Sequence, residues 1–315
     1  MRIACISHRD LDGLACVAVL QRYYSSVIYS TVSYRQFFSA LKKIAEKRLD
    51  TLYITDLGFR PGQEVLALLR GLRQQGCKVI VVDHHCWRAA DLQALKAANI
   101  DVFVDQNVCA ALGLYRLLSK ELGRDSKLER VLEIVNDVDL WKLRCGKLTV
   151  KWFVVSASPA ASESFLLEKL KSCTLWDEEL EQLFRREYSL LLELVRSIVE
   201  NFEKHYVNLG NYKLLLVKLP PRLAHQHTVL AELLRRKLQR KEIDVMAFFR
   251  PDGCVSLRAG TTSKCPDLAA IARKLGGGGH KKAAGLSLRY GWLDKLRYRL
   301  SSGLPKKELL LELFR

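Results

Sequence analysis

The feature that most constrains the fold is a regular alternation in the first half of the chain. Short apolar runs, each the length of a strand, are separated by segments with the three- and four-residue spacing of amphipathic helices. The strand-like runs cover residues 2–7, 27–33, 51–55, 78–82 and 100–104. Apolar strands that alternate with helices are typical of a parallel sheet covered by helices on both faces. The first half is therefore predicted to be an α/β domain.

Polar residues follow the first strand-like run at close spacing. Catalytic groups of parallel sheets gather beyond the carboxyl ends of the strands. Here His8, Asp10 and Asp12 stand at that place, just before a helical segment. Capping of the helix explains one aspartate, but it explains a histidine with two aspartates poorly. This mixture of imidazole and carboxylate suits divalent ions such as Mn²⁺.

Two other strand ends carry the same kinds of side chain. Asp56 follows the third run, where a lone aspartate is a weak signal. Asp83, His84 and His85 follow the fourth run directly. Buried imidazole and carboxylate groups are costly unless they are paired or bind a metal. The third cluster therefore favours metal ligation over a purely structural role.

The second half has a different pattern. Apolar residues at helical spacing between residues 180 and 202 predict one long amphipathic helix. Strand-like and helical segments beyond it predict a smaller α/β domain. The predicted fold is thus α/β, with a mainly parallel sheet flanked by helices and joined by a long helix to the smaller domain. The predicted divisions are a catalytic domain at 1–150, a helical connector at 151–208 and a substrate-binding domain at 209–315.

A glycine-rich stretch, Gly276–Gly279, lies in the smaller domain and is followed by His280, Lys281 and Lys282. Consecutive glycines let backbone amides approach an anion closely. The spacing matches neither a Walker A loop nor a dinucleotide-binding fingerprint. A flexible hinge would not need the adjacent basic residues, so the stretch predicts an anion site.

The formal net charge of +17 favours a polyanionic partner, although a basic host proteome would produce the same bias. No apolar run reaches the roughly 18 residues of a membrane span, and the N-terminus lacks the apolar region of a signal peptide. A cytoplasmic protein without a membrane partner is expected. Nine cysteines without a C-x-x-C pair argue against zinc knuckles and a disulfide framework.

These clusters, in this order, resemble the DHH phosphoesterase family. Asp83-His84-His85 is the motif that names the family, and the segment from His8 to Gly13 resembles its first motif. The stretch Gly276–His280 with Ala283-Ala284-Gly285 is similar to the signature of the associated C-terminal domain of nano-RNases and RecJ-like exonucleases. The resemblance covers nearly the whole chain.

The resemblance implies two divalent metal ions, with Mn²⁺ expected and Mg²⁺ or Co²⁺ as alternatives. The implied metal ligands are His8, Asp10, Asp12, Asp56, His84 and Asp137. Asp56 would bridge the two ions. Where the family's fourth motif offers one aspartate, this chain offers Asp137 and Asp139; Asp137 is preferred.

The resemblance also implies roles outside the metal ligands. His85 would contact the scissile phosphate, and Asp83 would orient the neighbouring histidines. A substrate phosphate would be held in the cleft between the two domains. The implied substrate-binding residues of the C-terminal domain are Arg258, Gly277, Gly278, Gly279 and His280.

The leading hypothesis is a metal-dependent phosphodiesterase or exonuclease that acts on short RNA or DNA by two-metal activation of water. A small-nucleotide hydrolase, cleaving cyclic dinucleotides or 3′-phosphoadenosine 5′-phosphate, would use the same catalytic residues. A third hypothesis is a non-catalytic RecJ-like scaffold that binds nucleic acid, but this chain keeps all the implied ligands. A homodimer stays open.

Overall fold

A computed structural model describes residues 1–315. The chain divides into two compact units. The N-terminal unit comprises Met1–Ser156 and Ala160–Leu183, and the C-terminal unit comprises Ala157–Pro159 and Phe184–Arg315. The domain boundaries expected from the sequence, at residues 150 and 208, stay a prediction.

The N-terminal unit is built on a sheet of five parallel strands in the order β2-β1-β3-β4-β5. The strands are β1 (Ile3–His8), β2 (Val27–Val32), β3 (Thr51–Thr55), β4 (Lys78–Asp83) and β5 (Asp101–Val104). Their parallel pairing confirms the fold class expected from the alternating pattern. It also brings the carboxyl ends of β1, β3 and β4 to one edge of the sheet, side by side.

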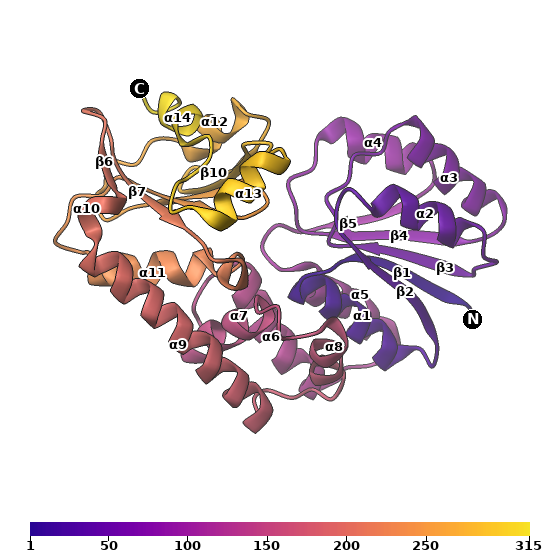
Figure 1. Ribbon diagram of the computed structural model, residues 1–315. Helices are drawn as coiled ribbons and strands as arrows, with labels where there is room; N and C mark the ends of the chain where they lie inside the picture. The colour runs from indigo at the N-terminus through magenta and orange to yellow at the C-terminus, as the bar shows by residue number, and fades with distance from the viewer. The chain divides into compact units, whose positions relative to one another are not determined.

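Helices cover both faces of this sheet (Figure 1). The helices α1 (Leu11–Tyr23) and α5 (Ala110–Leu122) lie on one face, and α2 (Phe37–Ala45) and α3 (Gln63–Gln74) lie on the other. A further helix, α4 (Ala89–Ala97), precedes β5. Because both faces are buried, the strands are apolar along most of their length rather than at alternate positions.

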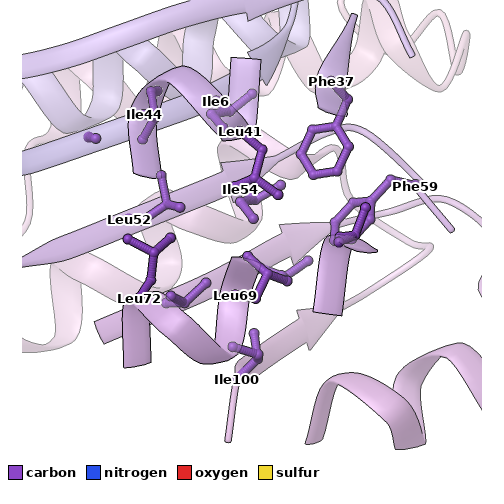
Figure 2. Packing of buried hydrophobic residues seen from close by; sticks show 14 of the residues in the cluster. Ile6, Phe37, Leu41, Ile44, Leu52, Ile54, Phe59, Leu69, Leu72 and Ile100 are labelled. Carbon is purple, nitrogen blue, oxygen red and sulfur yellow. The ribbon is translucent and has the colours of Figure 1, made fainter. Parts of the chain in front are cut away.

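Apolar side chains lock α2 and α3 onto the sheet, as Figure 2 shows. Ile6 and Ile54 project from β1 and β3 toward Leu41 of α2 and Leu69 of α3, and all four are at most 1% exposed. Burying a side chain of this size contributes about 1.5–3 kcal/mol. This packing fixes the strands, and with them the loops that leave their carboxyl ends.

The rest of the N-terminal unit is helical. It contains α6 (Ser126–Asp139), α7 (Lys147–Ser156) and α8 (Glu163–Lys171), of which α8 and the second half of α7 fall in the stretch expected to be a connector. The long amphipathic helix predicted from residue 180 onward is α9 (Glu178–Glu200), whose residues belong partly to each unit.

The C-terminal unit has a six-stranded mixed sheet in the order β10-β11-β9-β8-β7-β6. Only β7 and β8 pair in parallel. Its strands are β6 (Tyr206–Asn208), β7 (Lys213–Lys218), β8 (Val245–Phe249), β9 (Cys254–Ala259), β10 (Gly278–His280) and β11 (Ala283–Ser287). Its helical segments are α10 (Phe202–His205), the short turn η1 (Pro221–Leu223), α11 (His227–Lys237), α12 (Leu268–Arg273), α13 (Trp292–Leu300) and α14 (Lys307–Glu312). None of the helices in either unit is long and apolar enough to cross a bilayer.

Candidate active site

The first polar group lies where β1 and β3 end. His8 is the last residue of β1, and its Nδ1 atom is 2.7 Å from Oδ2 of Asp10 and 3.9 Å from Oδ2 of Asp56. Asp10 caps α1, with its Oδ1 atom accepting the amide hydrogen of Gly13 at 3.1 Å. A side chain at Gly13 would place Cβ 2.0 Å from the carbonyl oxygen of His8, so only glycine fits this turn.

The second polar group faces His84, which follows β4. The Nε2 atom of His84 is 3.2 Å from Oδ1 of Asp56, 3.5 Å from Oδ2 of Asp139 and 3.9 Å from Oδ2 of Asp12. Both oxygens of Asp12 also accept backbone amide hydrogens at the start of α5, from Ala110 at 2.8 Å and from Ala111 at 2.9 Å. Asp12 therefore anchors α5 while one of its oxygens faces His84.

Asp137, the residue preferred for the fourth motif, does not lie in this group in the structure. The Asp137 carboxylate accepts the backbone amide hydrogens of Arg144 at 2.9 Å and Cys145 at 2.8 Å, together with the hydroxyl of Thr149. These bonds hold the turn between α6 and α7. Asp139, two residues further along α6, brings a carboxylate oxygen close to ligand atoms of Asp12 and His84, all within 4.8 Å of one another.

Asp83 holds two loops of the site together. Its Oδ1 atom accepts the amide hydrogens of His84 at 2.7 Å and His85 at 2.8 Å, and lies 2.7 Å from Nδ1 of His85. Its Oδ2 atom accepts the amide hydrogens of Leu57 at 3.1 Å and Gly58 at 2.6 Å. The carboxylate thus fixes the backbone after β3 and after β4, and it orients the His85 ring.

The loop after β3 has a backbone that side chains rarely adopt. Asp56 has a φ of 55° and Gly58 a φ of 45°. A Cβ atom at Gly58 would lie 3.0 Å from Cβ and from Cγ of His85. The left-handed turn therefore brings the loop against the His85 ring, and it places the Asp56 carboxylate between His8 and His84.

The charges in this cluster are not balanced by the protein itself. Burial, together with the charges of Asp10 and Asp12, raises the pKa of Asp56 well above its ordinary value. Burial and neighbouring carboxylates likewise raise the pKa of Asp12 and of Asp139 to about 7. Such shifts mark a site where several buried carboxylates have converged.

Two carboxylate oxygens of the cluster have no hydrogen-bond donor from the protein. Oδ2 of Asp56 and Oδ2 of Asp139 are buried and have no hydrogen-bond partner. Buried carboxylate oxygens without a partner are strongly unfavourable unless a metal ion coordinates them. Three overlapping sets of side chains have ligand atoms close enough to hold an ion: Asp56, His84 and His85; His8, Asp10 and Asp56; and Asp12, His84 and Asp139. The residues present therefore fit divalent cations.

One residue of the site was missed by the sequence analysis. Tyr34, in the loop between β2 and α2, has its hydroxyl oxygen 3.1 Å from Nε2 of His85. Its ring stacks on the ring of His8, with centroids 4.8 Å apart and planes inclined by 25°. A single tyrosine in a loop carries no recognisable spacing, so nothing in the sequence alone pointed to it.

In the C-terminal unit, Arg258 and His280 lie on one face of the sheet. Ala283 of β11 pairs with Arg258 of β9 on one side and with His280 of β10 on the other. Residues directly opposite one another in antiparallel strands share a face. The Arg258 guanidinium donates to the carbonyl of Leu257 at 3.0 Å and to the hydroxyl of Thr228 at 3.3 Å.

The glycine stretch differs from the expected anion-binding loop. Its backbone forms a turn after α12 and then the edge strand β10. The amide of Gly277 already donates to the carbonyl of Ala272 at 2.9 Å. A Cβ atom at Gly277 would lie 2.2 Å from the carbonyl oxygen of Gly285, and one at Gly279 would lie 2.5 Å from that of Ala283. Close approach to β11 explains these two glycines without an anion.

Comparison with known proteins agrees with this geometry. Residues 215–302 match the DHHA1 domain. The oligoribonuclease NrnB of Bacillus subtilis is 25% identical over 311 residues, covering 90% of this chain and 72% of that protein. A 3′,5′-cyclic-nucleotide phosphodiesterase of Helicobacter pylori is 23% identical over 344 residues, covering 95% of this chain and 96% of that protein.

A solved structure shows the same fold. The pGpG-specific phosphodiesterase of Vibrio cholerae superposes with a TM-score of 0.51 at 13% identity, over 99% of both chains. That protein shares the two-unit α/β fold described above. The C-terminal unit carries the DHHA1 domain, and the findings together are consistent with a DHH phosphoesterase.

Proposed function

We propose that this protein is a metal-dependent phosphodiesterase that cleaves short oligonucleotides. The observation that carries the proposal is a pair of buried oxygens on Asp56 and Asp139 that have no hydrogen-bond partner and lie among imidazole and carboxylate groups. A purely structural cluster would satisfy these atoms with hydrogen-bond donors. The names of the two curated relatives, an oligoribonuclease and a cyclic-nucleotide phosphodiesterase, support the reaction class.

The side chains divide into two ligand sets, and Asp56 of the first set also lies next to His84 of the second. His8, Asp10 and Asp56 would hold one ion, and Asp12, His84 and Asp139 the other. Asp56 serves both sets because its Oδ2 atom faces His8 at 3.9 Å while its Oδ1 atom faces His84 at 3.2 Å. Two bound Mn²⁺ ions, with Mg²⁺ or Co²⁺ as substitutes, would lower the pKa of a water molecule and neutralise charge on the phosphoryl oxygens.

His85 is suited to contact the scissile phosphate. Its Nδ1 atom is bound to Asp83 at 2.7 Å, which leaves Nε2 on the opposite side of the ring. The hydrogen bond and the negative charge of Asp83 raise the pKa of His85 against the opposing effect of burial. A protonated ring can donate from Nε2 to a phosphoryl oxygen, where charge builds during the reaction.

Two observations favour short nucleic acids as the substrate. The net charge of +17 suits a polyanion, and Arg258 and His280 on one face of the C-terminal sheet could hold a second phosphate. Cyclic dinucleotides and 3′-phosphoadenosine 5′-phosphate carry the same groups and form the second candidate class. The cytoplasmic location expected from the sequence belongs to this proposal.

The proposal is tested with a panel of substrates in the presence of Mn²⁺. A 5′-labelled RNA pentamer, its DNA counterpart, a cyclic dinucleotide and 3′-phosphoadenosine 5′-phosphate are each incubated with the full chain. Cleavage of the pentamers at the highest kcat/KM is expected, together with complete loss of activity after chelation of the metal. Full activity in a metal-free preparation would overturn the mechanism. Salt-dependent binding of the pentamers without cleavage would favour the scaffold hypothesis instead.

A further inference from the structure

The loop that carries Tyr34 is fixed to the active site before any substrate arrives. The side-chain oxygen of Gln36 accepts hydrogen bonds from the amide of Ser33 at 3.1 Å and from its hydroxyl at 2.9 Å. The same oxygen accepts from the guanidinium of Arg9 at 2.8 Å. Arg9 stands between His8 and Asp10 in the chain. The loop is therefore tied to the segment that supplies two of the candidate metal ligands.

From this fixed loop, Tyr34 contacts two of the three histidines of the site, His85 and His8. One contact is the hydroxyl at Nε2 of His85, and the other is the ring stacked on His8. The side chain is nevertheless 53% exposed. A tyrosine that served only to pack would bury its ring and direct its hydroxyl to solvent or to the backbone. Here the hydroxyl points to the reactive edge of His85 instead.

The Tyr34 hydroxyl lies beside the position that a phosphate oxygen at His85 would take. Oδ1 of Asp83 is already an acceptor for two backbone amides, so Nδ1 of His85 carries a hydrogen toward it. The only ring atom of His85 left for a substrate is Nε2. An oxygen that accepts from Nε2 at an ordinary hydrogen-bond length of about 2.7–3.0 Å would also lie within reach of the Tyr34 hydroxyl.

We propose that Tyr34 is a phosphate-binding residue of this active site: its hydroxyl donates a hydrogen bond to a non-bridging phosphoryl oxygen that also lies against His85. The inference rests on the proposed function and adds a substrate contact to it. The stack on His8 holds the tyrosine ring in place, so the hydroxyl needs little reorganisation when the phosphate binds.

Two substitutions separate the hydroxyl from the ring. Tyr34→Phe removes the hydroxyl and keeps the stack on His8, whereas Tyr34→Ala removes both. Tyr29→Phe is the matched control, because Tyr29 is 43% exposed on the neighbouring strand β2 and has no contact with the site histidines. Tyr34→Phe is expected to lower kcat/KM about 10- to 100-fold, as the loss of a hydrogen bond to a charged oxygen does. Tyr34→Ala should lose more, and Tyr29→Phe should match the wild type.

A sulfur substitution in the substrate tests the contact directly. A phosphorothioate at the scissile phosphate replaces a non-bridging oxygen by a weaker acceptor. If Tyr34 donates to that oxygen, the sulfur substitution and the Tyr34→Phe substitution remove the same hydrogen bond. The phosphorothioate stereoisomer that lowers the rate of the wild type most should then lower the rate of Tyr34→Phe clearly less. A merely structural role for Tyr34 would give the same thio effect in both proteins. Equal thio effects, or wild-type kcat/KM for Tyr34→Phe, would overturn the inference and leave the phosphodiesterase function standing.

If the wild type cleaves none of the four substrates, the proposed function is refuted. The phosphate contact of Tyr34 can still be tested in that case. Binding of inorganic phosphate to the Mg²⁺-loaded full chain is then measured by calorimetry. Binding at least 10-fold weaker in Tyr34→Phe than in Tyr29→Phe would support the phosphate contact. Equal dissociation constants for the two variants would overturn it.

Discussion

The carboxyl edge of the N-terminal sheet and the glycine-rich edge of the C-terminal sheet both looked like ligand sites in the sequence, yet they are built differently. At the first edge, side chains from separate strands converge and leave buried oxygens of Asp56 and Asp139 without partners. At the second edge, the amide of Gly277 is already bonded and the glycines lie against the backbone of β11. The first edge has the donor atoms that a cation would need, whereas backbone contacts at the second edge already explain Gly277 and Gly279.

The difference shows which sequence signals report on ligands. Clustered aspartate and histidine at strand ends are costly to bury, so their presence points to something that neutralises them. Clustered glycines have a second explanation, which is close contact between two backbones. A glycine motif identifies an anion site only where its amides are unbonded, and this can be seen only in the folded structure.

The largest expected effect concerns the carboxylate shared by the two ligand sets. Asp56→Asn should lower kcat by at least about 1000-fold, because both ions would lose a charged ligand. Activity with Mn²⁺ and far-ultraviolet circular dichroism would be measured together. Asp101→Asn is the control and should keep full activity. Asp101 forms an ion pair with Lys78 at the amino ends of β5 and β4, at the edge of the sheet opposite the candidate site. If Asp56→Asn kept its activity, the N-terminal sheet edge would not differ from the glycine-rich edge in binding a catalytic metal ion.

The next comparison separates the two aspartates at the end of α6. Asp139→Asn should weaken Mn²⁺ binding and lower kcat about 100-fold, while its metal-free form gains thermal stability because a buried charge is removed. Asp137→Asn should keep the metal site and lose about 1–3 kcal/mol of stability, since the amide would place donors against the amides of Arg144 and Cys145. Metal titration and thermal unfolding of both variants distinguish the roles. The reverse pattern would restore Asp137 as the ligand.

At the glycine-rich edge, two adjacent substitutions have opposite expectations. Gly277→Ala should destabilise the protein by about 1–3 kcal/mol, because its Cβ would meet the carbonyl of Gly285 at 2.2 Å. Gly278→Ala should be nearly neutral, since nothing lies within 4 Å of its added Cβ. Chemical denaturation gives the two free energies of unfolding. A large rise in KM for Gly278→Ala without loss of stability would show that the stretch does hold a substrate phosphate.

The smallest expected effect is a pH dependence confined to the metal-free protein. The pKa values of Asp12 and Asp139 are raised to about 7 in the folded state, against about 3.9 for an unfolded aspartate. The folded state therefore binds more protons than the unfolded state between these values. The free energy of unfolding should therefore fall as the pH rises from about 4 to 7. Thermal unfolding at pH 5 and pH 8 checks the sign, and saturating Mn²⁺ should reverse it.

Much of the N-terminal unit followed from sequence patterns alone. The strand Thr51–Thr55 was predicted at its observed bounds, and β1, β2 and β4 were placed to within one residue at each end. Apolar runs report burial on both faces, and burial decides where strands lie. The convergence of His8, Asp56 and His84 followed from the same argument, because parallel strands bring their carboxyl ends to one edge.

The parts that could not be predicted depend on contacts between distant residues. Asp137 and Asp139 are equivalent in sequence, and only the turn that donates two amides to Asp137 separates them. The short strand β10 consists of two glycines and a histidine, so it has no apolar pattern to reveal it. Tyr34 is positioned by the hydrogen bonds of its loop, and these bonds correspond to no recognisable pattern in the sequence.

The Asp12 carboxylate connects the candidate metal site to the start of α5. Each oxygen of this carboxylate is bound by an amide at the start of α5, and one of them also faces His84. A metal ion that coordinates this oxygen would weaken the hydrogen bond that the oxygen accepts from the amide of α5. When a metal ion binds, the NMR chemical shifts of the Ala110 and Ala111 amide protons should therefore change, and so should their rates of exchange with deuterium. These changes can be measured without any substrate.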